Sequence, residues 1–434
     1  MGKTILIDTN LYLDDANIIF KLSGDGNNIL VPITVLKELD QKKYNKDFSY
    51  SARNAIRAIN DFMGKHPDNM VFDVNRYKEA DTPDERILMS ASNHGAVIAT
   101  KDVSMSMTAK SMGMDSLLQD TVLSGIFDPY VYVTMDQLYG ASGKDLFAFK
   151  QEYKGGEYFG MLDMLSGVCG RHLDAESWFF VFIKTESNKP VIYANNPFDV
   201  ELERIDIMPE FREIHNDGVT VKARDCYQIC AFYAMAKAPH VLITGRWGSG
   251  KSLLSTSYAI TATEKKIFIT RAPIGIDSKY SIGFLPGSRE EKMLDWLQGF
   301  MSATYYLYAN TRTGRQNSYD YVKDRIFNGR FEIVAMNSIQ GMSLLDGDIL
   351  IVDECQLIDI NHMSMIMSRP SGSSKLILLG DIKQTYDVVK PSESGLLKLL
   401  RVLPHKHMAY VELQNSYRSP LLEIADELQN KSIM

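Results

Sequence analysis

The feature that most restricts the fold is a glycine-rich turn between an apolar run and a helix start. The stretch VLITGRWGSGKSLLS, residues 241–255, reads as a buried strand, a loop with the spacing Gly-x4-Gly-Lys-Ser, and a helix. This is the context of a P-loop, whose backbone N–H groups surround a triphosphate at a helix N-terminus. An ordinary glycine-rich turn is the competing interpretation. The predicted contacts with ATP and Mg²⁺ are Gly245, Arg246, Trp247, Gly248, Ser249, Gly250, Lys251 and Ser252, with Lys251 on the outer phosphates and Ser252 on the metal.

Two carboxylates end another apolar run, ILIVDEC at residues 349–355. Acids at the end of a buried strand are costly unless a cation or a reaction uses them. We predict that Asp353 holds Mg²⁺ and that Glu354 activates the water that attacks the terminal phosphate. A third run, LILLGDIKQ, brings Gln384 to a position where its amide could sense that phosphate. A solvated strand end and an ordinary turn are the respective alternatives.

Three further residues are candidates for the same site. Arg369 and Arg418 could neutralise transition-state charge as arginine fingers, although a surface salt bridge is the more common role of a single arginine. Gln228 lies about twenty residues before the P-loop, where several helicase-like ATPases carry a glutamine that reads adenine. A glutamine on a helix surface is equally compatible with that position.

Four acids in the first 126 residues form a second candidate site. Asp8 and Asp102 close the apolar strands ILID and VIATKD, so both are expected at the carboxyl edge of one parallel sheet. The helical residues Glu38 and Asp84 would complete a group of oxygen ligands suited to Mg²⁺ or Mn²⁺. Such ions can generate hydroxide and support attack on a phosphodiester, which predicts a nuclease. Exposed helix charges and a helix cap at Asp102 are the alternatives.

A basic segment lies beside these acids and is a candidate contact for a nucleic-acid backbone, or else a solvated helix face. It consists of Lys42, Lys43, Lys46, Arg53 and Arg57.

Strand and helix patterns divide the chain into three parts. Residues 1–126 alternate short apolar strands with amphipathic helices, which predicts an α/β domain with a parallel sheet. Residues 127–205 contain the runs YVYVT, FAFK, WFFVFIK and VIYA between Gly, Asn and Pro, which predicts a small β-rich module, barrel-like in outline. Residues 206–434 return to alternating strands and helices and are predicted to form a RecA-like P-loop domain.

Bulk composition limits the alternatives. The formal net charge of -7 argues against a uniformly basic nucleic-acid coat, so contacts with RNA or DNA must come from local clusters. The four cysteines have no CxxC spacing, which favours a reducing cytoplasm. No run approaches the ~18 apolar residues that a membrane span requires, so we expect no membrane role.

With these motifs the chain resembles the family in which a PIN nuclease domain is fused to a PhoH-type ATPase. In the PIN half the matching stretches are LIDTN, VLKELD, ARNAIRAI, DERIL and ATKD, and the family's acids fall on Asp8, Glu38, Asp84 and Asp102. In the PhoH half they are GRWGSGKS, GFLPGSREEKM (residues 283–293), ILIVDECQ, SRPSGSSKLILLGDIKQ and YRSP. GFLPG is the most family-specific of these stretches.

The resemblance implies a cytoplasmic enzyme that couples ATP hydrolysis and RNA unwinding to ribonuclease cleavage. It also implies a homo-oligomeric ring, such as a hexamer, because a single RecA-like domain needs a neighbour to complete its ATP site. Two positions depart from the family pattern: Trp247 replaces a usual alanine, and Gln340 replaces the arginine of an Arg-Gly pair. The second change puts in doubt any RNA or inter-subunit contact of that arginine.

Two other functions stay open at the level of sequence. The first is an ATP-gated scaffold whose PIN domain grips RNA, single-stranded in the simplest case, without cutting it. The second is a toxin-like nuclease that the ATPase only regulates. DNA is an open alternative to RNA, since neither site reads a 2′-hydroxyl by sequence.

Overall fold

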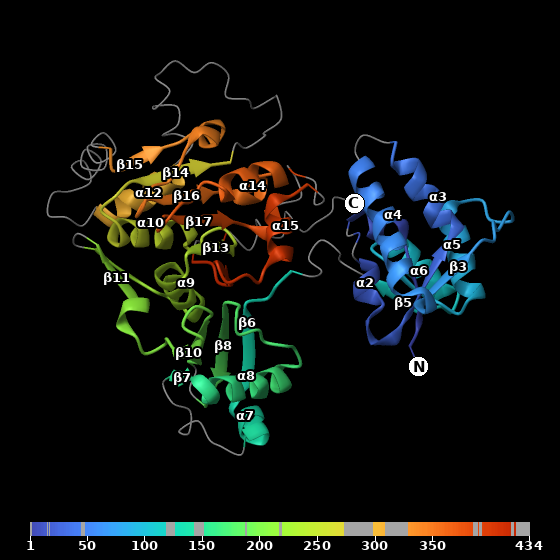
Figure 1. The fold of residues 1–434 in the computed structure, drawn as a ribbon, viewed down its shortest axis with the longest axis horizontal. Coiled ribbons are helices and arrows are strands. Elements are labelled where there is room, and N and C mark those ends of the chain that lie inside the picture. Colours follow the sequence, from blue (N-terminus) through green and yellow to red (C-terminus); the bar gives the residue numbers. More distant parts are fainter. Residues whose placement is uncertain are drawn as a thin grey trace. The chain divides into compact units, whose positions relative to one another are not determined.

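The computed structural model describes residues 2–14, 16, 18–44, 48–118, 126–142, 152–186, 189–216, 219–272, 298–308, 329–384, 389, 393–417 and 421. The chain forms two compact units, Met1–Ile126 and Phe127–Met434 (Figure 1). Each unit has its own hydrophobic core.

The N-terminal unit is built on a parallel sheet of five strands in the order β3-β2-β1-β4-β5. Its strands are β1 (Thr4–Ile7), β2 (Asn28–Pro32), β3 (Met70–Asp73), β4 (Val97–Thr100) and β5 (Ser116–Leu118). Its helices are α1 (Thr9–Asp14), α2 (Ile18–Leu22), α3 (Ile33–Lys42), α4 (Ser49–Lys65), α5 (Pro83–Asn93) and α6 (Val103–Ser111). The central strand β1 is almost entirely apolar because parallel strands are covered on both faces.

Local sequence signals explain where two of these helices form. In α4, the side chains of Ala52, Ala55, Ile59 and Phe62 recur at helical spacing and are all buried. Helix α5 begins with a capping box, in which the Thr82 side chain and Glu85 exchange hydrogen bonds with each other's backbone N–H groups. These signals confirm the predicted α/β domain.

The C-terminal unit contains a second parallel sheet of six strands, in the order β15-β14-β16-β17-β13-β18. Its strands are β13 (His240–Gly245), β14 (Ile267–Arg271), β15 (Phe331–Ile333), β16 (Ile349–Asp353), β17 (Lys375–Gly380) and β18 (Met408–Leu413). The helices around it are α9 (Cys226–Lys237), α10 (Lys251–Ala262), α12 (Gln298–Tyr308), α14 (Ile360–Met367) and α15 (Gly395–Val402). The non-sequential strand order brings segments far apart in the chain to one edge of the sheet.

A mixed sheet of five strands, in the order β6-β8-β9-β10-β7, belongs to the same unit. Its elements are β6 (Tyr130–Thr134), β7 (Glu152–Lys154), β8 (Phe179–Lys184), β9 (Val191–Asn196) and β10 (Glu201–Arg204), with α7 (Met135–Ser142) and α8 (Gly155–Cys169); a hairpin of β11 (Glu213–Asn216) and β12 (Val219–Lys222) follows. Among the described residues this sheet is open, with β6 and β7 at its edges, so the barrel-like outline expected from sequence is wrong. The expected FAFK strand, residues 147–150, lies outside the described residues.

The mixed sheet shares a core with the P-loop domain. Trp178 and Phe180 pack edge-on against Tyr233 of α9, with ring centroids 6.4 and 6.3 Å apart. Side chains on one face of the mixed sheet therefore belong to the same hydrophobic core cluster as side chains of β13 and β16.

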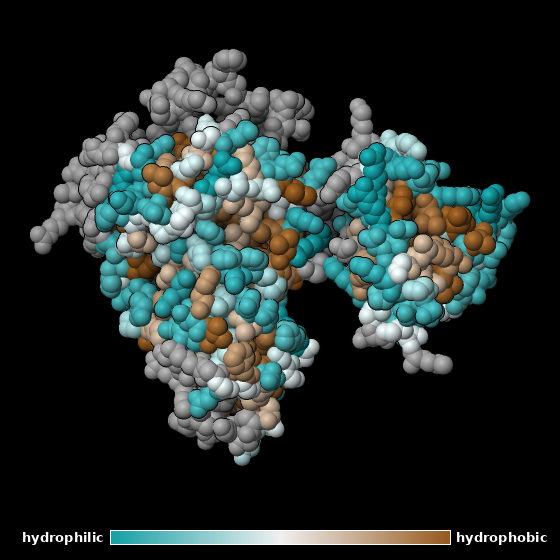
Figure 2. All heavy atoms as spheres, viewed as in Figure 1, coloured by the Kyte–Doolittle hydropathy of each residue, from teal (hydrophilic) through white to brown (hydrophobic). Residues whose placement is uncertain are grey.

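Hydrophilic side chains cover most of the visible face of both units, and hydrophobic ones appear in scattered groups (Figure 2). Among the helices that the structure describes, none has the length and apolar character to span a membrane.

Candidate functional sites

The P-loop connects the end of β13 to the start of α10, as the sequence predicts. Gly245, Gly248 and Gly250 have φ angles of 152°, 75° and 96°, a region that L side chains rarely adopt. A Cβ at Gly245 would stand 2.8 Å from the carbonyl oxygen of Leu413. These glycines let the backbone curl tightly where a phosphate chain would lie.

Lys251 is the charged group of this loop. Its Nζ donates to the carbonyl oxygen of Gly245 and, at 3.1 Å, to that of Arg246. Burial lowers the pKa of its amine, while the carboxylates of Asp381 and Asp353 partly oppose that shift. The amine is therefore partly removed from water, and the acids at the ends of β16 and β17 favour its charged form.

Asp353 and Glu354 lie at the carboxyl end of β16. Burial, followed by the charge of Glu354, raises the pKa of Asp353 to about 6, although Arg271 opposes the shift. Glu354 adopts a left-handed backbone conformation with φ 56°, which is strained for a side-chain-bearing residue. Its Oε1 accepts a hydrogen bond from Arg271 Nη2 at 3.1 Å.

A chain of amides connects Glu354 to the end of β17. Gln356 Nε2 donates to Glu354 Oε2 at 2.5 Å and to Gln384 Oε1 at 3.4 Å. Gln384 Nε2 in turn donates to Asp381 Oδ2 at 2.9 Å, and Asp381 N donates to Gln356 Oε1 at 3.1 Å. Gln384 is therefore coupled to the second carboxylate through Gln356.

These groups adjoin a cavity of about 550 Å³, a size typical of small-molecule sites. Its walls include Lys251, Ser252, Asp353 and Glu354, and it is also lined by Trp247, Gly248 and Gly250, with Arg224, Gln228, Tyr306 and Tyr417. Backbone cradle, cation and carboxylates meet in one space, so these residues fit a nucleoside triphosphate with a divalent ion.

Of the two arginines predicted as candidate fingers, Arg369 and Arg418, the structure describes only Arg369. In Arg369, Nε donates to Met365 O at 3.0 Å, Nη1 to Gln340 O at 2.9 Å, and Nη2 to Ser368 Oγ at 2.7 Å. All three nitrogens thus bind groups of its own chain, so a finger role in another subunit would require those bonds to break. Arg418 lies outside the described residues, as does the GFLPGSREEKM stretch.

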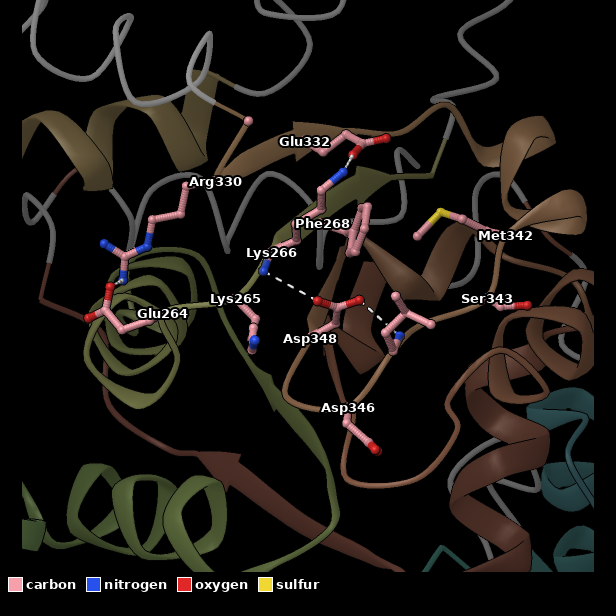
Figure 3. A pocket seen from close by; sticks show the side chains of 12 residues that line it. Glu264, Lys265, Lys266, Phe268, Arg330, Glu332, Met342, Ser343, Asp346 and Asp348 are labelled. Carbon is pink, nitrogen blue, oxygen red and sulfur yellow. Dashed lines mark hydrogen bonds and ion pairs between the residues drawn. The ribbon is translucent and has the colours of Figure 1, made fainter.

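A larger cavity, of about 800 Å³, lies at the opposite edge of the sheet, where β14, β15 and β16 begin (Figure 3). Several of its charged groups already have partners within the chain: Lys266 Nζ donates to Glu332 at 2.9 Å, and Asp348 accepts from the backbone N–H groups of Lys266 and Leu345. Ligands of open parallel sheets bind at the carboxyl edge. The smaller cavity is therefore the candidate nucleotide site.

In the N-terminal unit, Asp8 follows β1 and is only 3% exposed. Its Oδ2 accepts from Thr100 Oγ1 at 3.0 Å, across the neighbouring strand. Burial raises the pKa of Asp8 to about 6, and the charges of Asp84 and Glu38 add to the shift. A divalent cation would relieve both causes, so this carboxylate fits a metal ligand.

The other three acids are less closely gathered than predicted. Glu38 accepts from Thr9 Oγ1, Asp84 is exposed in the first turn of α5, and Asp102 caps α6 by accepting from the N–H groups of Ser104 and Met105. Among the described residues, no three His, Cys, Asp or Glu side chains lie close enough together to hold a metal ion. The compact nest expected from sequence is therefore not seen among the described residues: Glu38 and Asp102 accept hydrogen bonds from neighbouring groups, and Asp84 is exposed.

The basic segment beside these acids is partly engaged within the chain. Lys42 lies over the ring of Phe48 at 5.0 Å, and Lys43 binds Asp40. Arg53 and Arg57 are exposed one turn apart on α4, and Lys46 lies outside the described residues. The exposed arginines are the part of this segment that is open to a phosphate backbone.

Sequence reasoning missed Arg271 and Gln356. Arg271 ends β14 and pairs in register with Asp353, but that neighbourhood exists only once β14 is known to lie beside β16. Gln356 was visible in the ILIVDECQ run, two residues after Glu354, and this spacing was the signal that could have identified it.

Comparisons with known proteins agree with this geometry. Residues 220–428 match the family described as PhoH-like protein, and residues 5–118 match the PIN domain. Protein PhoH2 of Bacillus subtilis is 25% identical over 472 positions, covering 99% of this chain and 100% of its own length. Protein PhoH2 of Mycolicibacterium smegmatis is 24% identical, covering 98% of this chain and 96% of its own. These two domain matches and the relatives that the chain matches along nearly its whole length identify it as a member of the family that joins a PIN domain to a PhoH-type P-loop ATPase.

Proposed function

We propose that this chain is an ATP-dependent RNA-processing enzyme, in which the PIN domain cleaves RNA with divalent metal and the PhoH domain hydrolyses ATP to unwind RNA or move along it. The observation that carries the proposal is the meeting of Lys251, Asp353 and Glu354 at one glycine-lined cavity. A lysine amine at a phosphate cradle, with carboxylates beside it, is the set of groups that P-loop enzymes use for phosphoryl transfer to water.

Each group at the cavity has a part in this proposal. Lys251 exchanges its two carbonyl acceptors for phosphate oxygens, to which it is attracted by charge. Glu354 accepts the proton of the attacking water, and Arg271 and Gln356 hold its two oxygens in place. Mg²⁺, when bound, would neutralise phosphate charge between Ser252 and Asp353. Gln384 senses the reaction through Gln356.

In the PIN domain, Asp8 is the central metal ligand of the proposal. Its burial and its interaction with the charges of Glu38 and Asp84 support Mg²⁺ or Mn²⁺ there. Glu38 and Asp84 would turn toward the ion, since their present partners are a threonine hydroxyl and solvent. Asp102 contributes through its own oxygen or through Thr100, to which its backbone N–H donates at 3.0 Å.

The proposal extends to partners and assembly. Single-stranded RNA is the proposed substrate, with DNA as its variant, and Arg53 and Arg57 are proposed backbone contacts. A homo-oligomeric ring would let an arginine of a neighbour, Arg418 being the candidate, complete the ATP site. The unpaired cysteines fit a cytoplasmic location.

The test is the rate of ATP hydrolysis with and without RNA or DNA oligomers, with cleavage products run from the same tubes. We expect RNA to stimulate hydrolysis, and Mn²⁺ to support cutting that Asp8→Asn removes. Absence of ATP hydrolysis under all conditions would refute the motor half, and cutting without any divalent ion would refute the nuclease half.

One alternative has an observation in its favour. The separated carboxylates of the PIN domain are what an ATP-gated scaffold that grips RNA without cutting would have. RNA binding without cleavage in Mn²⁺, at wild-type ATPase rate, would favour it. ATP-independent cutting with no unwinding would instead favour a toxin-like nuclease that the ATPase domain only regulates.

A further inference from the structure

The carbonyl groups on the outer side of the P-loop are held by a segment distant in sequence. Ser416 Oγ donates to Trp247 O at 2.6 Å, and Tyr417 N donates to Gly248 O at 3.0 Å. A trans peptide directs its C=O and N–H in opposite directions. Fixing these carbonyls therefore fixes the direction of the N–H groups that follow them.

Gln228 continues this pattern at the next peptide. Its Nε2 donates to Ser249 O at 2.9 Å, and its Oε1 accepts from Arg224 N at 2.9 Å. The side chain is 4% exposed, and a Cβ at Gly250 would lie 3.2 Å from Nε2. Both ends of the amide are thus used by the protein's own backbone, in a space with little room for rotation.

Asp225 joins the two supports. Its Oδ1 accepts from Gln228 N as the cap of α9, and its Oδ2 accepts from Tyr417 Oη at 2.5 Å and from Asn415 Nδ2 at 3.0 Å. We call Asp225, Gln228, Asn415, Ser416 and Tyr417 the P-loop brace. Through it, three successive P-loop carbonyls are held from outside the loop.

We propose that Gln228 is a positioning residue of the P-loop rather than the residue that reads the base, and that the site accepts different bases with little discrimination. A glutamine reads adenine by using its donor and its acceptor together. If Gln228 read adenine in this way, it would have to give up its hydrogen bonds to Ser249 O and Arg224 N at the same time. The loop that must hold the phosphates would then be less firmly fixed. The inference rests on the proposed ATPase and specifies its substrate class as nucleoside triphosphates in general.

The walls of the cavity support this substrate class. Tyr306, Tyr417 and Trp247 present aromatic rings, and the Arg224 guanidinium lies 5.0 Å from the centre of the Tyr417 ring. Aromatic rings stack on any base, because every base has a π face. A site built to hydrogen-bond one base edge instead rejects analogues by roughly 10⁴-fold.

The first experiment uses the full-length wild-type chain with ATP, GTP, CTP and UTP. We expect the four kcat/KM values to lie within about tenfold of one another, as stacking without edge recognition allows. A preference for ATP on the order of 10³-fold or more would overturn the inference, since some group would then have to read the adenine edge.

The second experiment compares Gln228→Met, which keeps the side-chain length but removes both hydrogen bonds, with Gln137→Met. The control also removes a bond to a backbone N–H, that of Thr134 at 2.8 Å, in the same unit but outside the cavity lining. We expect Gln228→Met to lower kcat on the order of 10-fold to 100-fold, by the same factor for all four nucleotides. The control should leave kcat unchanged.

Three results would each be decisive. A selective loss of ATP over GTP in Gln228→Met would show that Gln228 reads the base. A lower melting temperature of Gln228→Met with an unchanged kcat of the folded protein would show a merely structural role. Either of these two results would overturn the inference. Failure of every nucleotide to displace a fluorescent nucleotide from the wild type would refute the proposed ATPase itself, and the inference with it.

Discussion

Replacing the buried Asp8 by asparagine should stabilise the PIN domain while removing its cleavage activity. Asp8 is 3% exposed, and burial followed by neighbouring acids raises the pKa of its carboxyl from 3.8 to about 6. At neutral pH the carboxylate is charged in both states, so the folded state bears a penalty of about 2 pKa units, or ~3 kcal/mol. Asparagine has the same shape without the charge.

The sign of the pH dependence follows from the direction of the shift. Because the folded state binds the proton more tightly than the unfolded state, the wild type regains stability as the pH falls through about 6. The advantage of Asp8→Asn should therefore be largest above pH 7, roughly half as large near pH 5, and nearly gone near pH 4.

Hydrogen exchange read by mass spectrometry measures this in the full chain, because peptides from each unit report separately. At neutral pH the slowest amides of β1, β2 and β4 should exchange up to ~100-fold more slowly in Asp8→Asn, which corresponds to ~3 kcal/mol. Asp61→Asn, at an exposed position of α4, is the matched control and should change little. Faster exchange in Asp8→Asn at both neutral and acidic pH would refute the reasoning.

The C-terminal unit offers three further predictions. Lys251→Ala should abolish ATP turnover and leave the melting temperature within a few degrees, since the amine binds only loop carbonyls; unchanged turnover would contradict its phosphate role. ATPase activity should fall as the pH drops below about 6, where the carboxyl of Asp353 becomes protonated and loses its affinity for cations; a flat profile down to pH 5 would argue against it. Gly380→Ala should destabilise this unit by about 1–3 kcal/mol, because the added Cβ would stand 2.7 Å from Cys355 Sγ. Gly156→Ala is the control: it has open space around it in α8 and should stabilise the unit by up to ~1 kcal/mol. Calorimetry measures both changes in the free energy of unfolding.

The sequence predicted those parts of the protein that depend on neighbours along the chain. The strand before Gly245 and the helix from Lys251 follow from the glycine spacing of the loop, and the segment that carries Asp84 was predicted as a helix. The acids at strand ends were also identifiable, because parallel strands place their carboxyl ends at one edge.

What sequence reasoning could not supply were contacts set by strand order and by competition among donors. Arg271 meets Glu354 only because β14 lies beside β16, although 83 residues separate them. Arg369 was a candidate finger by residue type, yet three backbone carbonyls and a serine hydroxyl occupy its guanidinium. Gln228 matched a base-reading position, and only the fold reveals that its amide spans Arg224 and Ser249.

The central claim is that the glycine-lined cavity binds a triphosphate through Lys251. A crystal structure with a non-hydrolysable ATP analogue and Mg²⁺ measures this directly. We expect Lys251 Nζ to leave the carbonyl oxygens of Gly245 and Arg246 and to lie on the outer phosphates, with the base against Tyr417. An analogue bound elsewhere, or Lys251 still on those two carbonyls beside bound phosphates, would contradict the account.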